Sequence, residues 1–100
     1  MDINNFLKLH QTDVSVIISK LGDEFSSHDF IEEFAKIFEE EYIEMLYARK
    51  NSGSAFQTVH SIIAKYLSIN MSLLAISKST KKASENVFGN VDCIQWWIKI

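Results

Sequence analysis

Proline is absent from this chain of 100 residues, and cysteine occurs once, at Cys93. A lone cysteine cannot form an internal disulfide, so nothing in the sequence indicates an oxidising compartment. The first residues have no basic segment followed by an apolar one, and no apolar run approaches the roughly 18 residues that a membrane helix requires. We therefore expect a cytoplasmic protein with no membrane partner.

Arginine is almost missing as well, because Arg49 is the only arginine among ten basic residues. A composition rich in lysine and isoleucine is typical of a low-GC coding bias, and we expect a bacterial or phage source. Arginine is the usual bidentate reader of guanine in the major groove. Its scarcity therefore disfavours recognition of DNA sequence through guanine.

No group of side chains has the spacing of a catalytic or metal site. The three histidines lie on separate predicted elements, without the i, i+4 or C-x-x-C spacing of metal ligands. Neighbouring residues on a helix diverge, so neither His60 with Ser61 nor the run Glu39–Glu41 converges on one bond. We expect a protein that is not an enzyme, has no cofactor or metal, and holds Cys93 as a small buried apolar group.

Hydrophobic residues make up 47% of the chain, which supports one globular domain over residues 1–100. Ser26 is a predicted N-cap, flanked by Phe25 and Phe30 as a hydrophobic staple. Ser54 and Gln57 predict a second capping box. Helical periodicity and these caps predict helices over Ile3–Leu9, Thr12–Leu21, Ser26–Arg49 and Ala55–Ser68, with Gly22 ending the second.

A β-ribbon is predicted near the C-terminus. Alternating residues over Ile94–Ile100 indicate a half-buried strand. We expect a two-stranded ribbon of about Leu74–Lys78 and Ile94–Lys99 with a basic connecting loop, and Ser77–Lys82 as a phosphate-contacting loop or wing. Alternation of Val14, Val16 and Ile18 would also suit a strand in place of the second helix. The expected fold class is mainly α with a small C-terminal β-ribbon (α+β): a helical bundle, with a winged-helix-like arrangement as one form of it.

A sharp division of charge runs along the chain. Residues 23–44 carry nine acidic side chains and one basic one, for a net charge of −8. Residues 45–84 carry six basic side chains and no acidic one, for a net charge of +6. A uniformly mildly acidic protein would rarely leave so long a segment without a carboxylate, so the division calls for an explanation.

The first explanation is that the basic segment 45–84 binds nucleic acid, most naturally the phosphate backbone of DNA. Helices followed by a β-ribbon with a basic loop are typical of winged-helix regulators, and a short helix near Asn70–Ala75 would be the reading element. This hypothesis requires the lysines to form one positive face away from the acidic helix. Its predicted contacts are Lys65, Lys78, Ser79, Thr80, Lys81 and Lys82.

Three alternatives stay open. The acidic helix and the basic segment can neutralise one another within the fold. The chain can be a protein-interaction module, such as a phage or mobile-element inhibitor whose carboxylates imitate a phosphate backbone, or an accessory subunit that forms a homodimer. The interaction hypothesis uses the acidic helix over residues 29–44, with contacts at Glu32, Glu33, Glu40 and Glu44.

Trp96 and Trp97 are adjacent in the predicted strand, so their side chains point to opposite faces of the sheet. One of them belongs to the core, and the other is either covered by a loop or exposed as an interaction anchor. The protein-interaction hypothesis assigns the anchor to Trp97.

Overall fold

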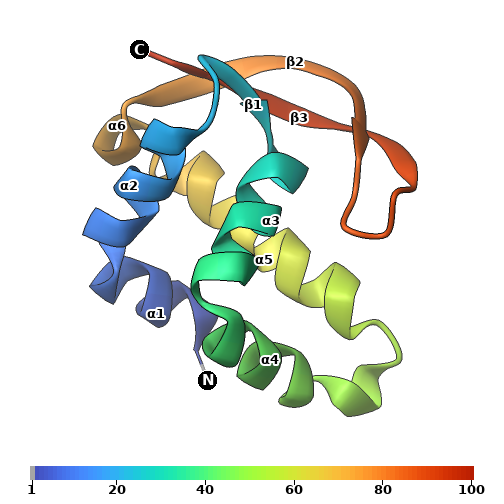
Figure 1. The fold of residues 1–100 in the computed structure, drawn as a ribbon. Coiled ribbons are helices and arrows are strands. Elements are labelled where there is room, and N and C mark those ends of the chain that lie inside the picture. Colours follow the sequence, from blue (N-terminus) through green and yellow to red (C-terminus); the bar gives the residue numbers. More distant parts are fainter. Residues whose placement is uncertain (1) are drawn as a thin grey trace.

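The computed structural model describes residues 2–100, in which helices precede a C-terminal β-hairpin (Figure 1). The α-helices are α1 (Ile3–Leu9), α2 (Gln11–Lys20), α3 (Ser27–Ile37), α4 (Glu39–Tyr47), α5 (Ala55–Ile69) and α6 (Met71–Leu74), with a 3₁₀ helix η1 at Lys50–Ser52. The strands are β1 (Glu24–Ser26), β2 (Ile76–Glu85) and β3 (Val91–Lys99). The predicted α+β fold class is confirmed.

The sheet has three antiparallel strands in the order β1-β3-β2, so β3 is central. The sequence did not predict β1, whose Phe25 lies opposite Trp97. The prediction of a loop or wing at Ser77–Lys82 was wrong, because these residues belong to β2. As an edge strand, β2 is exposed along most of its length and held by backbone bonds to β3, so it needs no apolar alternation.

The single helix predicted over Ser26–Arg49 was also wrong, because the chain bends at Phe38 between α3 and α4. Phe38 has φ −109° and ψ 49°, outside the helical region, and its ring meets that of Phe6 edge to face with centroids 5.2 Å apart. The apolar stripe continues through the bend, so the periodicity gave no sign of it. The predicted cap is confirmed: Ser26 Oγ accepts from Asp29 N at 3.0 Å, and Asp29 Oδ2 accepts from Ser26 N at 2.9 Å.

The remaining helix boundaries follow the sequence closely. The first helix is confirmed, and the second is a helix and not a strand, beginning after His10. The capping box predicted at Ser54 does not form, and Gly53, with φ 75°, makes the turn before α5 instead. Gly22 does not adopt the left-handed conformation expected of it, because Leu21 already leaves α2 in an extended conformation.

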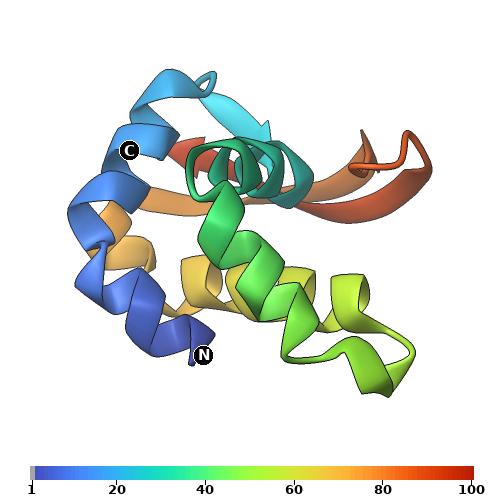
Figure 2. The same cartoon turned by 60° about the horizontal axis from the view of Figure 1, so that its bottom comes forward.

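The core lies between the helices and one face of the sheet. In Figure 1, β2 and β3 cross one side of the molecule while α1 and α4 lie on the other, and Figure 2 shows the same arrangement after rotation. Trp97 from β3 is 1% exposed. Its Nε1 donates a hydrogen bond to Ser27 Oγ at 2.9 Å, and this bond links the sheet to α3. The largest fully buried side chains around it include Phe25, Phe30, Phe34, Ile63 and Leu67.

No helix among residues 2–100 combines the length and the apolar character that crossing a membrane requires.

Candidate nucleic-acid interface

Two of the predicted lysines share the helix-facing side of β2. Lys78 lies opposite the buried Trp97, and Lys81 lies opposite Gln95. Residues directly opposite in an antiparallel pair share a face, and Trp97 and Gln95 are two positions apart on β3. A β-bulge between Lys78 and Lys81 sets two residues of β2 against one residue of β3, so both lysines point to the same face of the sheet. Without it, two lysines three positions apart would point to opposite faces.

Lys65 is exposed on α5 and lines a second cavity, together with Asn4 and Lys8 of α1 and Gln11 of α2. It lies one helical turn after Ser61, which lines the same cavity as Lys81. Among residues 2–100, no carboxylate comes within 4.0 Å of Lys65, Lys78 or Lys81. Thr80, another predicted contact, is exposed within the bulge. Three ammonium groups without an ion-pair partner in the described chain are therefore carried by α5 and β2.

Lys82 and Ser79 are engaged elsewhere, contrary to what the phosphate-contact hypothesis requires. Lys82 Nζ lies 2.5 Å from Glu24 Oε1 and 4.6 Å from the centroid of the Trp96 ring. Ser79 Oγ donates to the other oxygen of Glu24 at 2.5 Å. These hydrogen bonds from Lys82 and then Ser79 lower the pKa of Glu24. Partial neutralisation between the acidic and basic segments is therefore real, and it takes place at β1.

The acidic residues of the alternative interface are divided by the bend. Glu32 and Glu33 lie half-buried on α3, and Glu40 and Glu44 lie exposed on α4. Glu33 pairs within its own helix, with Lys36 Nζ at 3.5 Å. In the described part of the chain, none of these four pairs with a lysine of residues 45–84.

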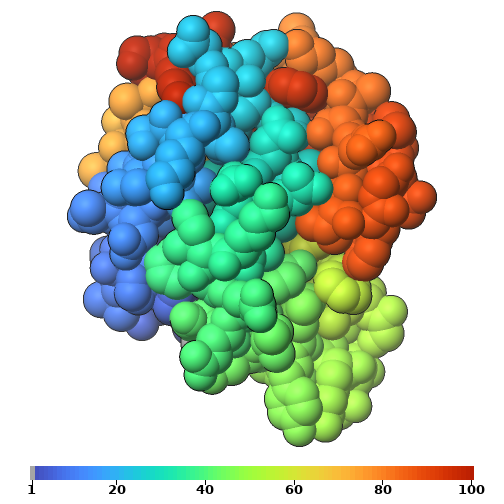
Figure 3. Space-filling model, viewed as in Figure 1, coloured from blue at the N-terminus to red at the C-terminus, as the bar shows by residue number. Residues whose placement is uncertain are grey.

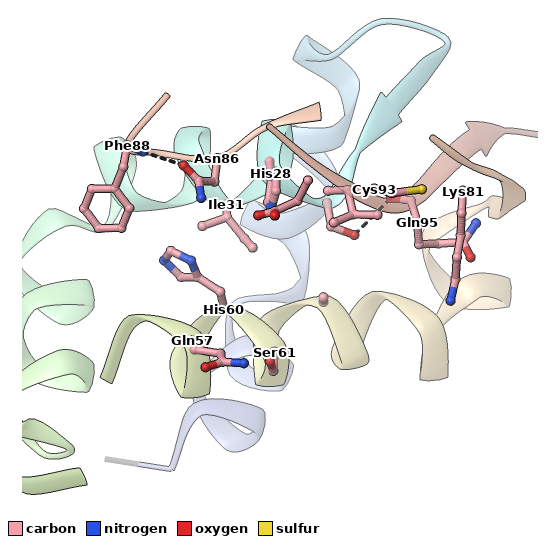
Figure 4. Close-up of a pocket in the computed structure, with 14 residues that line it drawn as sticks. His28, Ile31, Gln57, His60, Ser61, Lys81, Asn86, Phe88, Cys93 and Gln95 are labelled. Atoms are coloured by element: carbon pink, nitrogen blue, oxygen red, sulfur yellow. Dashed lines mark hydrogen bonds between the residues drawn. The ribbon is translucent and has the colours of Figure 1, made fainter. Parts of the chain in front are cut away.

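A cavity of about 560 Å³ separates α5 from the β2–β3 hairpin (Figure 4). The space-filling view shows the hairpin against α3 and α5 on the side of the molecule seen in Figure 3. Figure 4 shows the Lys81 side chain extending from β2 toward α5. The lining residues are Ser27, His28 and Ile31 of α3, Gln57, His60, Ser61 and Ala64 of α5, and Lys81, Asn86, Phe88, Asp92, Cys93, Ile94 and Gln95 of the hairpin.

Two histidines lie at one end of this cavity. His28 Nδ1 is buried and has no hydrogen-bond partner among the described residues. His60 Nε2 lies 2.6 Å from the Tyr42 hydroxyl. Burial, followed by the neighbouring His28, lowers the pKa of His60, and burial raises the pKa of Tyr42. At neutral pH the His60 ring is therefore uncharged, and its Nε2 shares one hydrogen bond with the Tyr42 hydroxyl.

The hairpin tip closes against the beginning of α5. The rings of Phe88 and Phe56 meet edge to face with centroids 4.8 Å apart. Asn86 Oδ1 accepts from the backbone N–H groups of Phe88 at 2.9 Å and Asn90 at 3.1 Å, which shapes the turn. The residues Phe88–Asn90 therefore belong to the turn of the hairpin.

Two expectations about single residues need correction. Trp97 is buried, so it cannot be an exposed anchor, and Trp96 on the outer face of the sheet is the half-buried one. Cys93, expected to be buried, is exposed within β3 and borders the cavity. Pairing with Phe25 of β1 determines which face of the sheet each β3 side chain points to, and the sequence did not predict β1.

The cavity itself was not predicted from the sequence. His28 and Gln95 are 67 positions apart, and only the sheet register and helix packing bring them to one space. The alternation of Cys93, Gln95 and Trp97 was the available signal, since it puts all three on one face. In residues 2–100, no three His, Cys, Asp or Glu side chains are placed to hold a metal ion.

Comparisons with protein-family models, with curated proteins and with solved structures found no match to this chain.

Proposed function

We propose that this chain is a nucleic-acid-binding protein with a winged-helix-like arrangement. Two helices, α4 and α5, joined by a turn and followed by the β2–β3 hairpin, suit that class, in which a helix enters a groove and the hairpin contacts the backbone beside it. The element assigned to reading changes from Asn70–Ala75 to α5. Helix α6 has four residues and is too short, whereas α5 has fifteen.

The observation that carries the proposal is the set of unpaired ammonium groups on Lys65, Lys78 and Lys81. The bulge brings two of them to one face of β2, and α5 carries the third. Each phosphate that a lysine neutralises releases counterions, so affinity falls with salt with a slope of about −0.9 per contact. Three contacts predict a slope of about −3 in a plot of log K against log salt.

Fluorescence anisotropy with a labelled oligonucleotide at about 50 mM salt and above tests this proposal. Lys81→Gln should weaken binding and reduce the salt slope by about one unit. Lys82→Gln is the matched control, since it removes the same charge from the neighbouring residue, where Glu24 already holds it. The triple variant of Lys65, Lys78 and Lys81 to Gln should lose measurable binding.

Two results would contradict the proposal. One is the absence of binding by the unaltered protein at low salt. The other is an equal loss of affinity in Lys81→Gln and Lys82→Gln, which would mean that net charge and not this surface governs binding.

Binding of a basic protein partner through α4 is a second candidate function, favoured by an exposed mixed surface. Ile43 and Tyr47 are 56% and 65% exposed, and Glu40 and Glu44 lie beside them on the same short helix. Apolar anchors rimmed by charge are typical of protein interfaces. Glu40→Lys with Glu44→Lys should abolish partner binding in a pull-down while Glu85→Lys on the hairpin leaves it intact, and equal retention by both variants would exclude α4.

A further inference from the structure

We infer that the cavity between α3, α5 and the β2–β3 hairpin takes one unstacked nucleobase of a single-stranded nucleic acid, an inference that rests on the function proposed above. The volume of about 560 Å³ lies within the range of about 300–1,000 Å³ usual for small-molecule sites. Such a site would make a single strand the preferred partner of the lysine surface.

The walls of the cavity are suited to the faces of a base. The imidazole rings of His28 and His60 and the ring of Phe88 line it, and Ile31 adds an apolar surface. Bases that leave the stack pack on aromatic side chains, histidine included. Because burial keeps His60 uncharged near neutral pH, its ring is a flat neutral surface.

Unused hydrogen-bonding groups in the cavity are suited to the edge of a base. In the described chain, the side chains of Gln57 and Ser61 have no hydrogen-bond partner, and neither does the buried Nδ1 of His28. The Oδ1 of Asn86 accepts two hydrogen bonds within the hairpin turn, and its amide N–H groups stay free in the described chain. A buried polar atom without a partner is costly, and a ligand that satisfies it recovers that cost.

The polar groups favour a base that carries an exocyclic amino group. A glutamine carboxamide with both ends free can bond bidentately to adenine, and a carboxylate can accept from the amino group of cytosine. Gln57 offers the first and Asp92 the second, from opposite sides of the cavity. Adenine and cytosine therefore suit the site better than thymine or uracil.

Lys81 is placed to hold the backbone of the same strand. Lys81 lines the cavity, and Lys65 lies one turn along α5 from the lining residue Ser61. A phosphate attached to the inserted nucleotide thus has the Lys81 ammonium group beside it. A duplex would have to unpair and unstack the base first, at a cost of a few kcal/mol.

The experiment measures the Kd of the full chain for strands and duplexes of about twelve nucleotides, a usual length for single-strand sites. The single strand should bind at least about tenfold more tightly than the duplex at the same salt concentration. Oligo-dC should bind several-fold more tightly than oligo-dT, which has the same charge but lacks the amino group. Equal Kd values for strand and duplex would overturn the inference, and a preference for oligo-dT would overturn the choice of base.

A cavity-filling variant isolates the site. Ser61 is exposed and its hydroxyl has no partner in the described chain, so Ser61→Phe fills the cavity without loss of a hydrogen bond or charge. It should weaken oligo-dC binding by about tenfold and bring it to within about twofold of oligo-dT binding. Ser15→Phe, at an exposed position of α2, is the matched control, and circular dichroism checks the folding of both variants.

The results separate the two proposals. If the unaltered protein binds neither strand nor duplex, the proposed function fails and this inference with it. If it binds a duplex through Lys81, and neither single-strandedness nor Ser61→Phe changes the Kd, the proposed function stands and only the cavity inference fails.

Discussion

Lys82 Nζ lies 2.5 Å from Glu24 Oε1, across the outer face of the central strand β3. The two residues belong to the two edge strands, which share no backbone hydrogen bonds in the sheet order β1-β3-β2. The same ammonium group lies over the Trp96 ring, so the pair closes over the half-buried tryptophan. This contact links the acidic segment to the basic one. Lys81 points to the opposite face of the sheet.

The first prediction concerns Glu24 and acid. Hydrogen bonds from Lys82 and then Ser79 hold the pKa of Glu24 below its ordinary value of 4.5. A carboxyl group of this kind contributes stability above its ordinary pKa and loses it as the pH falls through the lowered pKa. Urea denaturation should therefore show Glu24→Gln less stable than the unaltered protein at about pH 7, with a smaller difference at about pH 3.

The control for this measurement is Glu85→Gln, at an exposed position near the hairpin tip. It should leave the free energy of unfolding nearly unchanged at both pH values. A difference between Glu24→Gln and the unaltered protein that stays constant with pH would show that the ion pair is not its source.

The second prediction concerns the two tryptophans. Trp97 is 1% exposed and hydrogen-bonded to Ser27, so Trp97→Ala should cost about 3–5 kcal/mol. This is a large part of the 5–15 kcal/mol typical of a domain, and the variant should be poorly folded at room temperature. Trp96→Ala should cost clearly less, because its ring is only half-buried on the outer face.

Chemical denaturation followed by circular dichroism makes the comparison, since it does not depend on the tryptophan removed. Trp97→Phe supplies an intermediate, because it keeps most of the buried apolar surface but loses the hydrogen bond to Ser27. A larger loss of stability in Trp96→Ala than in Trp97→Ala would show that the assigned register of β3 is wrong.

The third prediction concerns His60 near neutral pH. Burial, and then His28, holds the pKa of His60 below its ordinary value of 6.5. The unfolded chain therefore binds more protons than the folded one just below that value, so stability is lost as the pH falls below about 6.5 and is complete above it. The urea midpoint should drop between about pH 7.5 and about pH 5.5.

His60→Gln should flatten this dependence, because glutamine does not titrate. His10→Gln, between α1 and α2 and away from Tyr42, should retain it. An unchanged pH dependence in His60→Gln would assign the effect to another group.

The elements predicted correctly are those whose signals are local. The Ser26–Asp29 cap joins residues three positions apart, and the helices at Ile3–Leu9 and Ala55–Ile69 are defined by their own periodicity. The bend at Phe38 and the strand β1 carry no such signal. The bend follows packing of Phe38 on Phe6, and β1 is a strand because three residues pair with β3.

The sequence predicted which lysines belong to the candidate interface, but not which of them share a face of the fold. The absence of acids from residues 45–84 pointed to Lys65, Lys78, Lys81 and Lys82 together. The tertiary structure separated them, because the β2 bulge puts Lys78 and Lys81 on one face while Lys82 turns outward to Glu24. The presence of a bulge depends on how two strands pair, which neither strand encodes alone.

The sequence by itself determined the charge division, the caps and periods of the main helices, and the α+β class, because each depends on residue types or on spacings of a few positions. Only the tertiary structure decided which tryptophan is buried, which lysines remain unpaired, and that His28, Gln57 and Gln95 line one cavity. These features join residues many positions apart, and their contacts follow from strand register and helix packing.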